Sequence, residues 1–225
     1  MPRIIFVTGT DTGVGKTLLT GLLLYHLRQE GCHALALKPF CSGSRADAQF
    51  LNAIQDGELS QDEITPFFFS EPLAPLAAAR KHRRSIRLAD ALPRIKRLAQ
   101  RCECLLVEGI GGVMVPLGEG FAVIDLIARL GCRTILVSRN RLGTINHTLL
   151  SVRALQHAGI KELRLVLSAL PEGDASSDSN SSVLSELAAP TPVFVIPFLG
   201  RKAGRLGGFG LAEKKLKKTL ARILS

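Results

Sequence analysis

Short apolar runs, rich in branched side chains, alternate along the chain with longer stretches in which apolar residues recur every three or four positions. The first pattern predicts buried strands and the second predicts amphipathic helices. The predicted strands span 3–8, 33–38, 104–107, 133–138, 163–167 and 193–196. The predicted helices span 16–29, 46–55, 85–101, 121–130, 144–158, 179–189 and 211–223.

This alternation predicts an α/β fold, because neighbouring parallel strands must be joined by a crossover connection that a helix usually provides. The runs 104–107 and 134–137 are almost entirely apolar, which is typical of central strands covered on both faces. We interpret the Ser-, Asp- and Asn-rich stretch 172–182 as a loop, since regular patterns resume after it. No repeat or break in composition divides the chain. We therefore expect one domain over 1–225, with a mainly parallel sheet and helices on both faces.

Composition narrows the class of protein. Of the 225 residues, 46% are hydrophobic, which is enough for a sizeable core and excludes a disordered chain. No apolar run approaches the roughly 20 residues that a membrane-spanning helix needs. The first apolar run leads directly into a glycine-rich motif rather than a cleavage site. We therefore expect a cytoplasmic protein without a membrane partner.

The cysteines and phenylalanines offer little chemistry of their own. The five cysteines are odd in number, and Cys102 and Cys104 are too close together for the usual zinc-binding pair. We interpret the cysteines as ordinary buried thiols in a reducing compartment. The run Phe67-Phe68-Phe69 is interpreted as packing.

The net charge of +10 is concentrated in two segments. Segment 80–101 holds nine basic residues and one acidic residue, and segment 201–222 holds eight and one, so the remaining residues carry a net charge of −5. Basic surfaces attract nucleic acids, but a single aromatic residue, Phe209, lies between these charges and could stack on bases. Charge runs usually cover solvated helix faces. No nucleic-acid partner is therefore expected.

The most informative segment is 9–17, Gly-Thr-Asp-Thr-Gly-Val-Gly-Lys-Thr, which follows a predicted strand and opens a predicted helix. Its glycines let backbone N–H groups converge on an anion at the helix N-terminus, as in phosphate loops, although the spacing is one residue longer than the common form. Lys16 would reach the β- and γ-phosphates, and the Thr17 hydroxyl would lie on Mg²⁺. The predicted nucleotide contacts here are Gly13, Val14, Gly15, Lys16, Thr17 and Leu18.

Two further segments place charged residues where strands end. Lys38-Pro39 closes the second predicted strand and Asp47 opens the next helix, while Glu108 follows the third strand. Ligands of open α/β sheets bind at the carboxyl edge of the strands. Thr17, Asp47 and Glu108 would supply the oxygen ligands that Mg²⁺ prefers, and two lysines would neutralise a transferring phosphoryl group. Further predicted nucleotide contacts are Asp47, Glu108, Gly109, Ile110 and Gly111.

Together these motifs resemble the dethiobiotin synthetase family, ATP-dependent carboxylases that close a ureido ring. The resemblance extends from the N-terminus to about residue 170. It runs through 9–17, Lys38-Pro39, Ser42-Gly43, Asp47, Glu71-Pro72, Pro75, 108–112 and 142–147, in matching order.

The resemblance implies a fold, a reaction and a set of roles. The fold would be a phosphate-loop α/β domain acting as a homodimer, with the active site near the subunit interface. The enzyme would be a cyclo-ligase that carboxylates 7,8-diaminononanoate with CO₂ and closes the ring with MgATP, through a carbamate and its mixed anhydride with phosphate. Its small-molecule substrates are therefore the diamine, CO₂ and a nucleoside triphosphate.

The resemblance also assigns residues. Catalytic roles fall to Thr12, Lys16 and Lys38, the metal ligands would be Thr17, Asp47 and Glu108, and Ser42 would bind the diamine. Backbone amides at a helix start contributed by the partner subunit would hold the substrate carboxylate. That helix start comprises Gly143, Thr144, Ile145 and Asn146.

The nucleotide base would lie near four later residues, Ser168, Pro197, Phe198 and Leu199. Ser168 stands where relatives usually carry an adenine-reading asparagine, and this departure from the family predicts looser base selectivity. Gly13 stands where many relatives carry an acidic residue, so any role of that carboxylate is missing here.

Three other functions share parts of this pattern. A partition or septum-site ATPase switch, binding DNA or membrane, would carry a lysine where this chain has Asp11. A cobyrinate-type amidotransferase would need an additional glutaminase domain, for which 225 residues leave no room. A nucleic-acid-binding module that merely retains the loop would bind with strong salt dependence and without need of Lys16.

Overall fold

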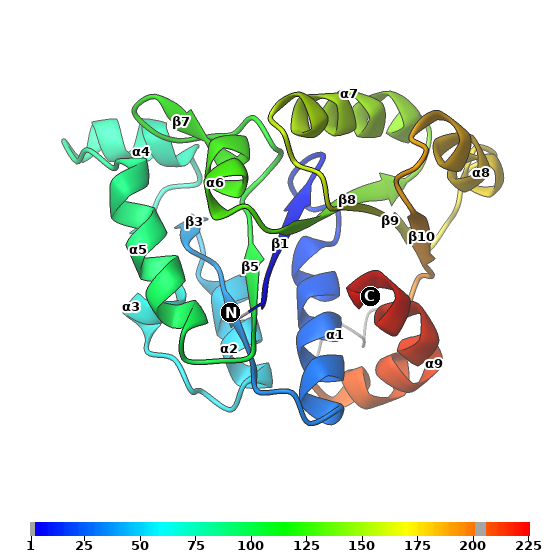
Figure 1. Ribbon diagram of the computed structural model, residues 1–225, viewed down its shortest axis with the longest axis horizontal. Coiled ribbons are helices and arrows are strands. Elements are labelled where there is room, and N and C mark those ends of the chain that lie inside the picture. Colours follow the sequence, from blue (N-terminus) through cyan, green and yellow to red (C-terminus); the bar gives the residue numbers. More distant parts are fainter. Residues whose placement is uncertain (1–2, 201–205) are drawn as a thin grey trace.

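The computed structural model describes residues 3–200 and 206–225, and its centre is a six-stranded parallel sheet (Figure 1). The strand order is β10-β9-β8-β1-β5-β2. Their bounds are β1 (Arg3–Gly9), β2 (Ala34–Leu37), β5 (Cys104–Glu108), β8 (Arg133–Asn140), β9 (Leu163–Ala169) and β10 (Val193–Ile196). Each of these strands was predicted from the sequence, and the expected α/β class with a mainly parallel sheet is confirmed.

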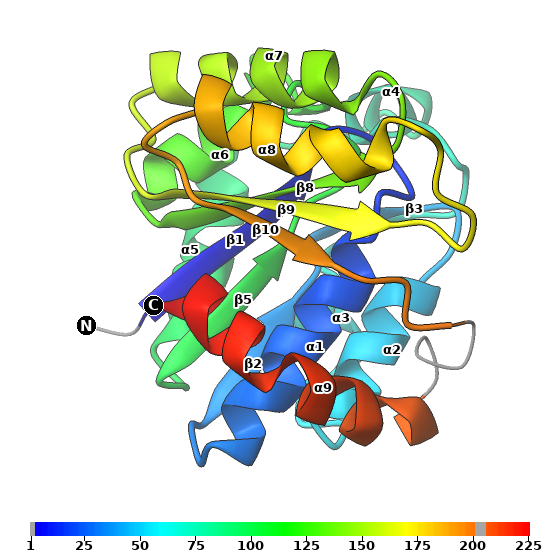
Figure 2. The ribbon, with the colours of Figure 1, turned by 90° about the vertical axis from the view of Figure 1, so that its right-hand side faces the viewer.

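Helices cover both faces of this sheet, as Figure 2 shows. On one face α1 (Lys16–Gln29) lies between α2 (Ala46–Ile54) and α9 (Leu206–Leu224). On the other face lie α5 (Leu88–Ala99), α6 (Val123–Leu130), α7 (Thr144–His157) and α8 (Ser177–Leu187). The buried apolar side chains of both layers form one continuous core in the described part of the chain.

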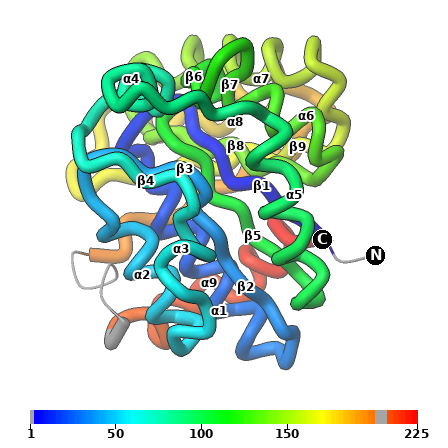
Figure 3. The backbone as a smooth tube through the Cα atoms, turned by 90° about the vertical axis from the view of Figure 1, so that its left-hand side faces the viewer, coloured from blue at the N-terminus to red at the C-terminus, as the bar shows by residue number. Residues whose placement is uncertain are grey.

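Several short elements escaped the sequence patterns. They are β3 (Phe40–Ser42), β4 (Phe67–Phe69), β6 (Pro116–Gly118), β7 (Phe121–Ala122), α3 (Gln61–Ile64) and α4 (Pro75–Lys81). Figure 3 shows β3 and β4 paired next to α4. The four strands among them have only two or three residues, too few for a readable period, so packing decides them: Phe40 and Phe67 stack with their ring centroids 4.7 Å apart. Phe67 and Phe69 are buried, which confirms that the phenylalanine run serves packing.

Some predicted boundaries were wrong. The helix expected over 121–130 begins only at Val123, because 121–122 pair with β6 instead. The stretch 172–182 is not a loop throughout, since α8 begins at Ser177 after Asp174 accepts hydrogen bonds from the Ser176 backbone and hydroxyl. The basic segment 201–222 lies partly outside the described residues.

The cysteines are all free thiols: three are buried and two, Cys32 and Cys132, are half-buried. Burial raises the pKa of Cys102 to about 11 and that of Cys132 to about 12, so these side chains stay protonated near neutral pH.

None of the helices in the described ranges is long and apolar enough to cross a membrane.

Candidate active site

The phosphate loop spans the six residues between the end of β1 and the start of α1. Gly15 precedes the helix with φ 103°, a left-handed conformation that favours glycine. An added Cβ at Gly15 would also lie 2.9 Å from the Ser168 hydroxyl oxygen. Close approach and backbone conformation together therefore require glycine at this position, and the first backbone N–H groups of α1 remain free for an anion.

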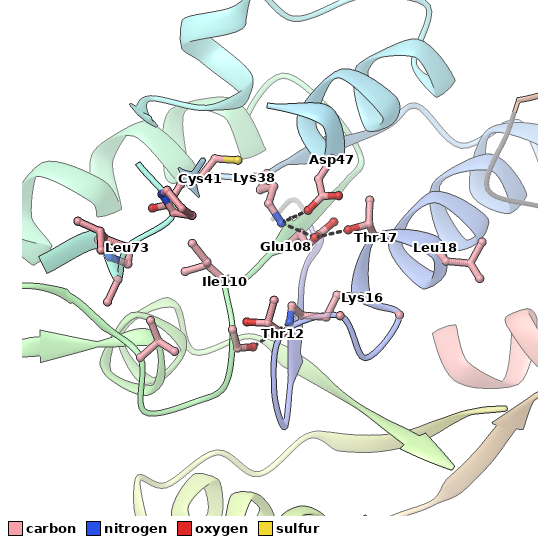
Figure 4. Close-up of a pocket in the computed structure, with 18 residues that line it drawn as sticks. Thr12, Lys16, Thr17, Leu18, Lys38, Cys41, Asp47, Leu73, Glu108 and Ile110 are labelled. Carbon is pink, nitrogen blue, oxygen red and sulfur yellow. Dashed lines mark hydrogen bonds and ion pairs between the residues drawn. The ribbon is translucent and has the colours of Figure 1, made fainter. Parts of the chain in front are cut away.

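A cavity of about 660 Å³ opens beside this loop, at the carboxyl edge of β1, β5 and β2 (Figure 4). Most of the site residues predicted from the sequence lie in its walls. They are Thr12, Gly13, Gly15, Lys16, Thr17, Leu18, Lys38, Ser42, Asp47, Glu108, Ile110 and Gly111.

Strand register explains why residues seventy positions apart meet here. Leu37 of β2 is paired with Val107 of β5, so the next residues, Lys38 just after β2 and Glu108 at the end of β5, lie side by side. The Lys38 ammonium lies 2.5 Å from Glu108 Oε1 and 3.0 Å from Asp47 Oδ2, and the Thr17 hydroxyl donates to Glu108 Oε1 at 2.7 Å (Figure 4).

Glu108 shows that this cluster fits a cation. Its side chain is fully buried, and among the described residues Oε2 has no hydrogen-bond partner. A carboxylate oxygen can only accept, so an orphaned one in the interior needs a donor or a positive charge. Together with the Asp47 carboxylate and the Thr17 hydroxyl, it offers the oxygen set that suits Mg²⁺.

The two lysines of the site are held in different electrostatic states. Burial and the nearby Lys38 ammonium lower the pKa of Lys16 to about 8, and its Nζ donates to the carbonyls of Asp11 (2.7 Å) and Gly111 (2.9 Å). Burial by itself would also lower the pKa of Lys38, but the carboxylates of Glu108 and Asp47 outweigh it and raise that pKa. Lys38 is therefore a permanent cation, whereas Lys16 can lose its proton at mildly alkaline pH.

The far wall of the cavity is apolar, and apart from Ile110, a predicted nucleotide contact, the sequence analysis assigned no role to its residues. It consists of Cys41, Pro72, Leu73, Ala74, Pro75, Ile110 and Val115. Hydrogen bonds from His82, Lys81 and Ser70 lower the pKa of Glu71 to about 2 and tie the start of this wall to α4. Pro72 and Pro75, which belong to the motifs of the family resemblance, were the sequence signal that could have revealed this wall.

The Ser42 hydroxyl also lines the cavity, and it is buried without a partner in the described part of the chain.

Arg139 also contacts the site, and the sequence patterns did not reveal it. Its Nε and Nη2 donate to the Gly13 carbonyl at 3.0 and 2.8 Å, so the end of β8 holds the tip of the phosphate loop. Arg139 is paired in register with Ser168 of β9, which covers Gly15. The predicted strand ended at 138, and its extension to Asn140 is what places this side chain.

Other predicted residues lie outside the main cavity. Thr144, the first residue of α7, borders a separate small depression and accepts or donates a 2.6 Å hydrogen bond with Ser138. Val14 is packed in the core, and the N–H of Gly109 donates to a backbone carbonyl of β1. The segment 197–199 follows β10 beyond the cavity walls.

Comparison with known proteins places this site in a family. A family model described as an AAA domain matches residues 3–201. The ATP-dependent dethiobiotin synthetase BioD of Bacillus velezensis is 37% identical over 199 residues, covering 86% of this chain and 85% of the relative. The corresponding protein of Anaeromyxobacter dehalogenans (strain 2CP-C) is 39% identical over 213 residues, covering 91% and 96%.

Solved structures show the same fold at low identity. The septum site-determining protein MinD from Pyrococcus horikoshii, complexed with Mg-ADP, superimposes with a TM-score of 0.62 at 17% identity, covering 99% of both chains. A ParA family ATPase from Chlorobium tepidum gives 0.57 at 14% identity, covering 100% of this chain and 98% of that one. This likeness shows the fold alone. The similarity in sequence, in contrast, spans nearly the whole chain, which therefore belongs to the ATP-dependent dethiobiotin synthetase family.

Proposed function

We propose that this protein forms dethiobiotin from 7,8-diaminononanoate, CO₂ and ATP, and is thus an ATP-dependent cyclo-ligase of biotin synthesis. The observation that carries the proposal is the meeting of Lys16, Lys38 and a set of oxygen ligands at one end of a cavity whose opposite wall is apolar. The family supplies the identity of the substrates. The geometry supports a part for each residue.

The reaction needs no protein nucleophile. One amino group of the diamine adds to CO₂ and loses a proton, which gives a carbamate. A carbamate oxygen attacks the γ-phosphorus of ATP, and ADP leaves. The second amino nitrogen then attacks the carbonyl carbon of the mixed anhydride, loses its proton and expels inorganic phosphate, which closes the ureido ring.

The lysines would counter the main obstacle, which is the approach of two anions. Lys16 and Lys38 place two ammonium groups beside the phosphate loop, where they can neutralise the γ-phosphoryl group and the carbamate. Thr12 lines the same end of the cavity. Mg²⁺ held by Thr17, Asp47 and Glu108 would neutralise phosphate oxygens.

The remaining walls fit the diamine. A chain of methylene groups would lie against the apolar wall, away from water. The Ser42 hydroxyl, which has no hydrogen-bond partner among residues 3–200 and 206–225, lies in the same cavity and can hydrogen-bond an amino group or a carbamate oxygen.

A homodimer would complete the site. The start of α7 (143–146) lies outside the main cavity of its own chain, so its backbone amides could serve the carboxylate only from a second copy. Two apolar side chains, one just before α7 and one within it, are strongly exposed, as expected of an interface: Leu142 (80%) and Leu150 (60%).

The described residues contain few groups that could select one nucleotide base over another. Ser168 lies against Gly15, and its single hydroxyl cannot pair with a donor and an acceptor of adenine at the same time, as the C=O and NH₂ of an asparagine amide can. We expect turnover with several nucleoside triphosphates. Ser168→Asn should sharpen the preference for ATP, measured as kcat/KM for ATP, GTP and CTP, and an unchanged profile would show that this residue does not face the base.

The alternative of a DNA- or membrane-binding switch loses its support. The relatives that share 37–39% of their residues with this chain are named dethiobiotin synthetases, whereas the likeness to MinD and ParA is one of fold.

The deciding experiment measures phosphate release and product mass together. The protein is incubated with bicarbonate, Mg²⁺ and ATP, with and without 7,8-diaminononanoate. Diamine-dependent phosphate release with a dethiobiotin mass peak is expected, and it should fall by about a thousandfold in Lys38→Ala. Phosphate release that ignores the diamine would contradict the proposal, as would normal turnover by a folded Lys38→Ala variant.

A further inference from the structure

In the ligand-free protein Lys38 occupies the place that a cation would take. Its ammonium lies between the carboxylates of Glu108 and Asp47, at 2.5 and 3.0 Å, and both are proposed metal ligands. The third, the Thr17 hydroxyl, donates to the same Glu108 oxygen that accepts from Lys38. A positive side chain therefore already neutralises this set of oxygen ligands.

The burial of the cluster makes this neutralisation necessary. Glu108 is fully buried and Lys38 is 4% exposed, so neither charge is compensated by water. A buried carboxylate without a cation is strongly unfavourable. Lys16, the other lysine of the cavity, donates to two backbone carbonyls and to neither carboxylate. In the described structure Lys38 alone of the two lysines supplies the counter-charge.

A divalent cation on the same oxygens would reverse these interactions. The Glu108 and Asp47 oxygens that now attract the ammonium would bind the metal, and the ammonium would face a like charge at contact distance. The anionic groups of a nucleotide bound at the phosphate loop would lie in the same cavity, whose walls include Gly15, Lys16 and Thr17, and would offer the displaced ammonium new partners.

We propose that Lys38 competes with the divalent cation for Glu108 and Asp47, so that the free protein binds metal weakly and nucleotide-bound metal drives Lys38 from its resting place toward the reacting phosphoryl group. The identity of the anion that receives Lys38 rests on the proposed function. The competition itself does not. It makes the catalytic ammonium available only when metal and nucleotide are both in place.

The test is a titration of the nucleotide-free protein with Mn²⁺, a spectroscopically visible substitute for Mg²⁺, in wild type, Lys38→Met and Lys16→Met. We expect Lys38→Met to bind Mn²⁺ at least about tenfold more tightly than wild type, a difference that corresponds to about 1.4 kcal/mol. Lys16→Met is the matched control, because it removes a positive charge from the same cavity without freeing either carboxylate. Its affinity should stay within about twofold of wild type.

Thermal unfolding gives an independent readout. Removal of Lys38 leaves Glu108 without a counter-charge, so Mn²⁺ should raise the Tm of Lys38→Met much more than that of wild type. If Lys38→Met does not fold, Lys38→Gln keeps a donor near Glu108 while removing the charge.

Two results of the Mn²⁺ titrations would contradict the proposed competition. An unchanged or weaker Mn²⁺ affinity in the folded Lys38 variant would overturn the competition. An equal gain in both lysine variants would overturn it too, because it would reflect the net charge of the cavity rather than the two contacts. These titrations contain neither diamine nor nucleotide, so failure of dethiobiotin synthesis would leave their result unaffected.

Discussion

Lys16 illustrates how burial changes the chemistry of one side chain. In the free protein its pKa is lowered to about 8, first by burial and then by the Lys38 ammonium. Its unfolded pKa is near 10.5, so the folded state binds fewer protons than the unfolded state between these values. Stability contributed by this group therefore rises as the pH increases from about 8 toward 10.5. Below pH 8 the buried lysine is charged, and the cost of removing this charge from water lowers the stability of the folded state.

Nucleotide binding should act on this group in the opposite direction. The phosphates of ATP favour the charged ammonium, so binding raises the pKa of Lys16 and takes up a fraction of a proton near pH 8.5. Calorimetry in two buffers of different ionisation enthalpy measures this uptake, and affinity for ATP should fall as the pH rises through 8. Lys16→Met should show no comparable uptake. Proton uptake that is equal in both proteins would assign it to another group.

At the scale of elements, the end of β8 controls the phosphate loop. Arg139 donates two hydrogen bonds to the Gly13 carbonyl, and Thr10 donates a hydrogen bond to Ser138 at 3.3 Å. Two consecutive residues of one strand therefore hold the loop at its start and at its tip. The same Ser138 hydroxyl shares a hydrogen bond with Thr144 of α7, which links the loop to the start of that helix.

Arg139→Ala should loosen the loop without removing any group from the cavity walls. Loss of the two partly exposed bonds costs about 1 kcal/mol, so we expect the KM for ATP to rise about fivefold with little change in kcat. Arg139→Lys should recover part of this loss. Arg97→Ala, on the exposed face of α5, is the control and should leave KM unchanged. A large fall in kcat alone would show that Arg139 touches the reacting groups.

At the scale of the whole molecule, the proposed dimer makes a specific prediction. Leu150 is exposed on α7, and replacing it by aspartate should cost the isolated chain little stability but disfavour an apolar interface. Light scattering after gel filtration should show a dimer for wild type and a monomer for Leu150→Asp, with turnover lost in parallel.

Leu211→Asp provides the matched control for this prediction. Leu211 is 70% exposed on α9, on the opposite face of the sheet from α7 (Figure 2), and its substitution should leave the dimer intact. A Leu150→Asp variant that stays dimeric would place the interface elsewhere. A fully active monomer would show that the start of α7 does not serve a second chain.

The sequence by itself determined the main strands and helices of this protein and its phosphate loop. Six strands and seven long helices follow from periodic apolar patterns, because such patterns depend only on the local geometry of the backbone. The phosphate loop was equally readable, since its glycines, lysine and threonine are contiguous and their backbone requirements are local. Strand ends marked by Lys38 and Glu108 predicted the edge at which the site lies.

Only the tertiary structure decided what meets at that edge. The salt bridges of Lys38 with Glu108 and Asp47, the apolar wall over 72–75 and the bonds from Arg139 to Gly13 join segments far apart in the chain. Their formation depends on strand order, register and packing, none of which is encoded by the period of a single segment. Strands of two or three residues were missed for the same physical reason: contacts with neighbours stabilise them, whereas their own sequence is too short to specify them.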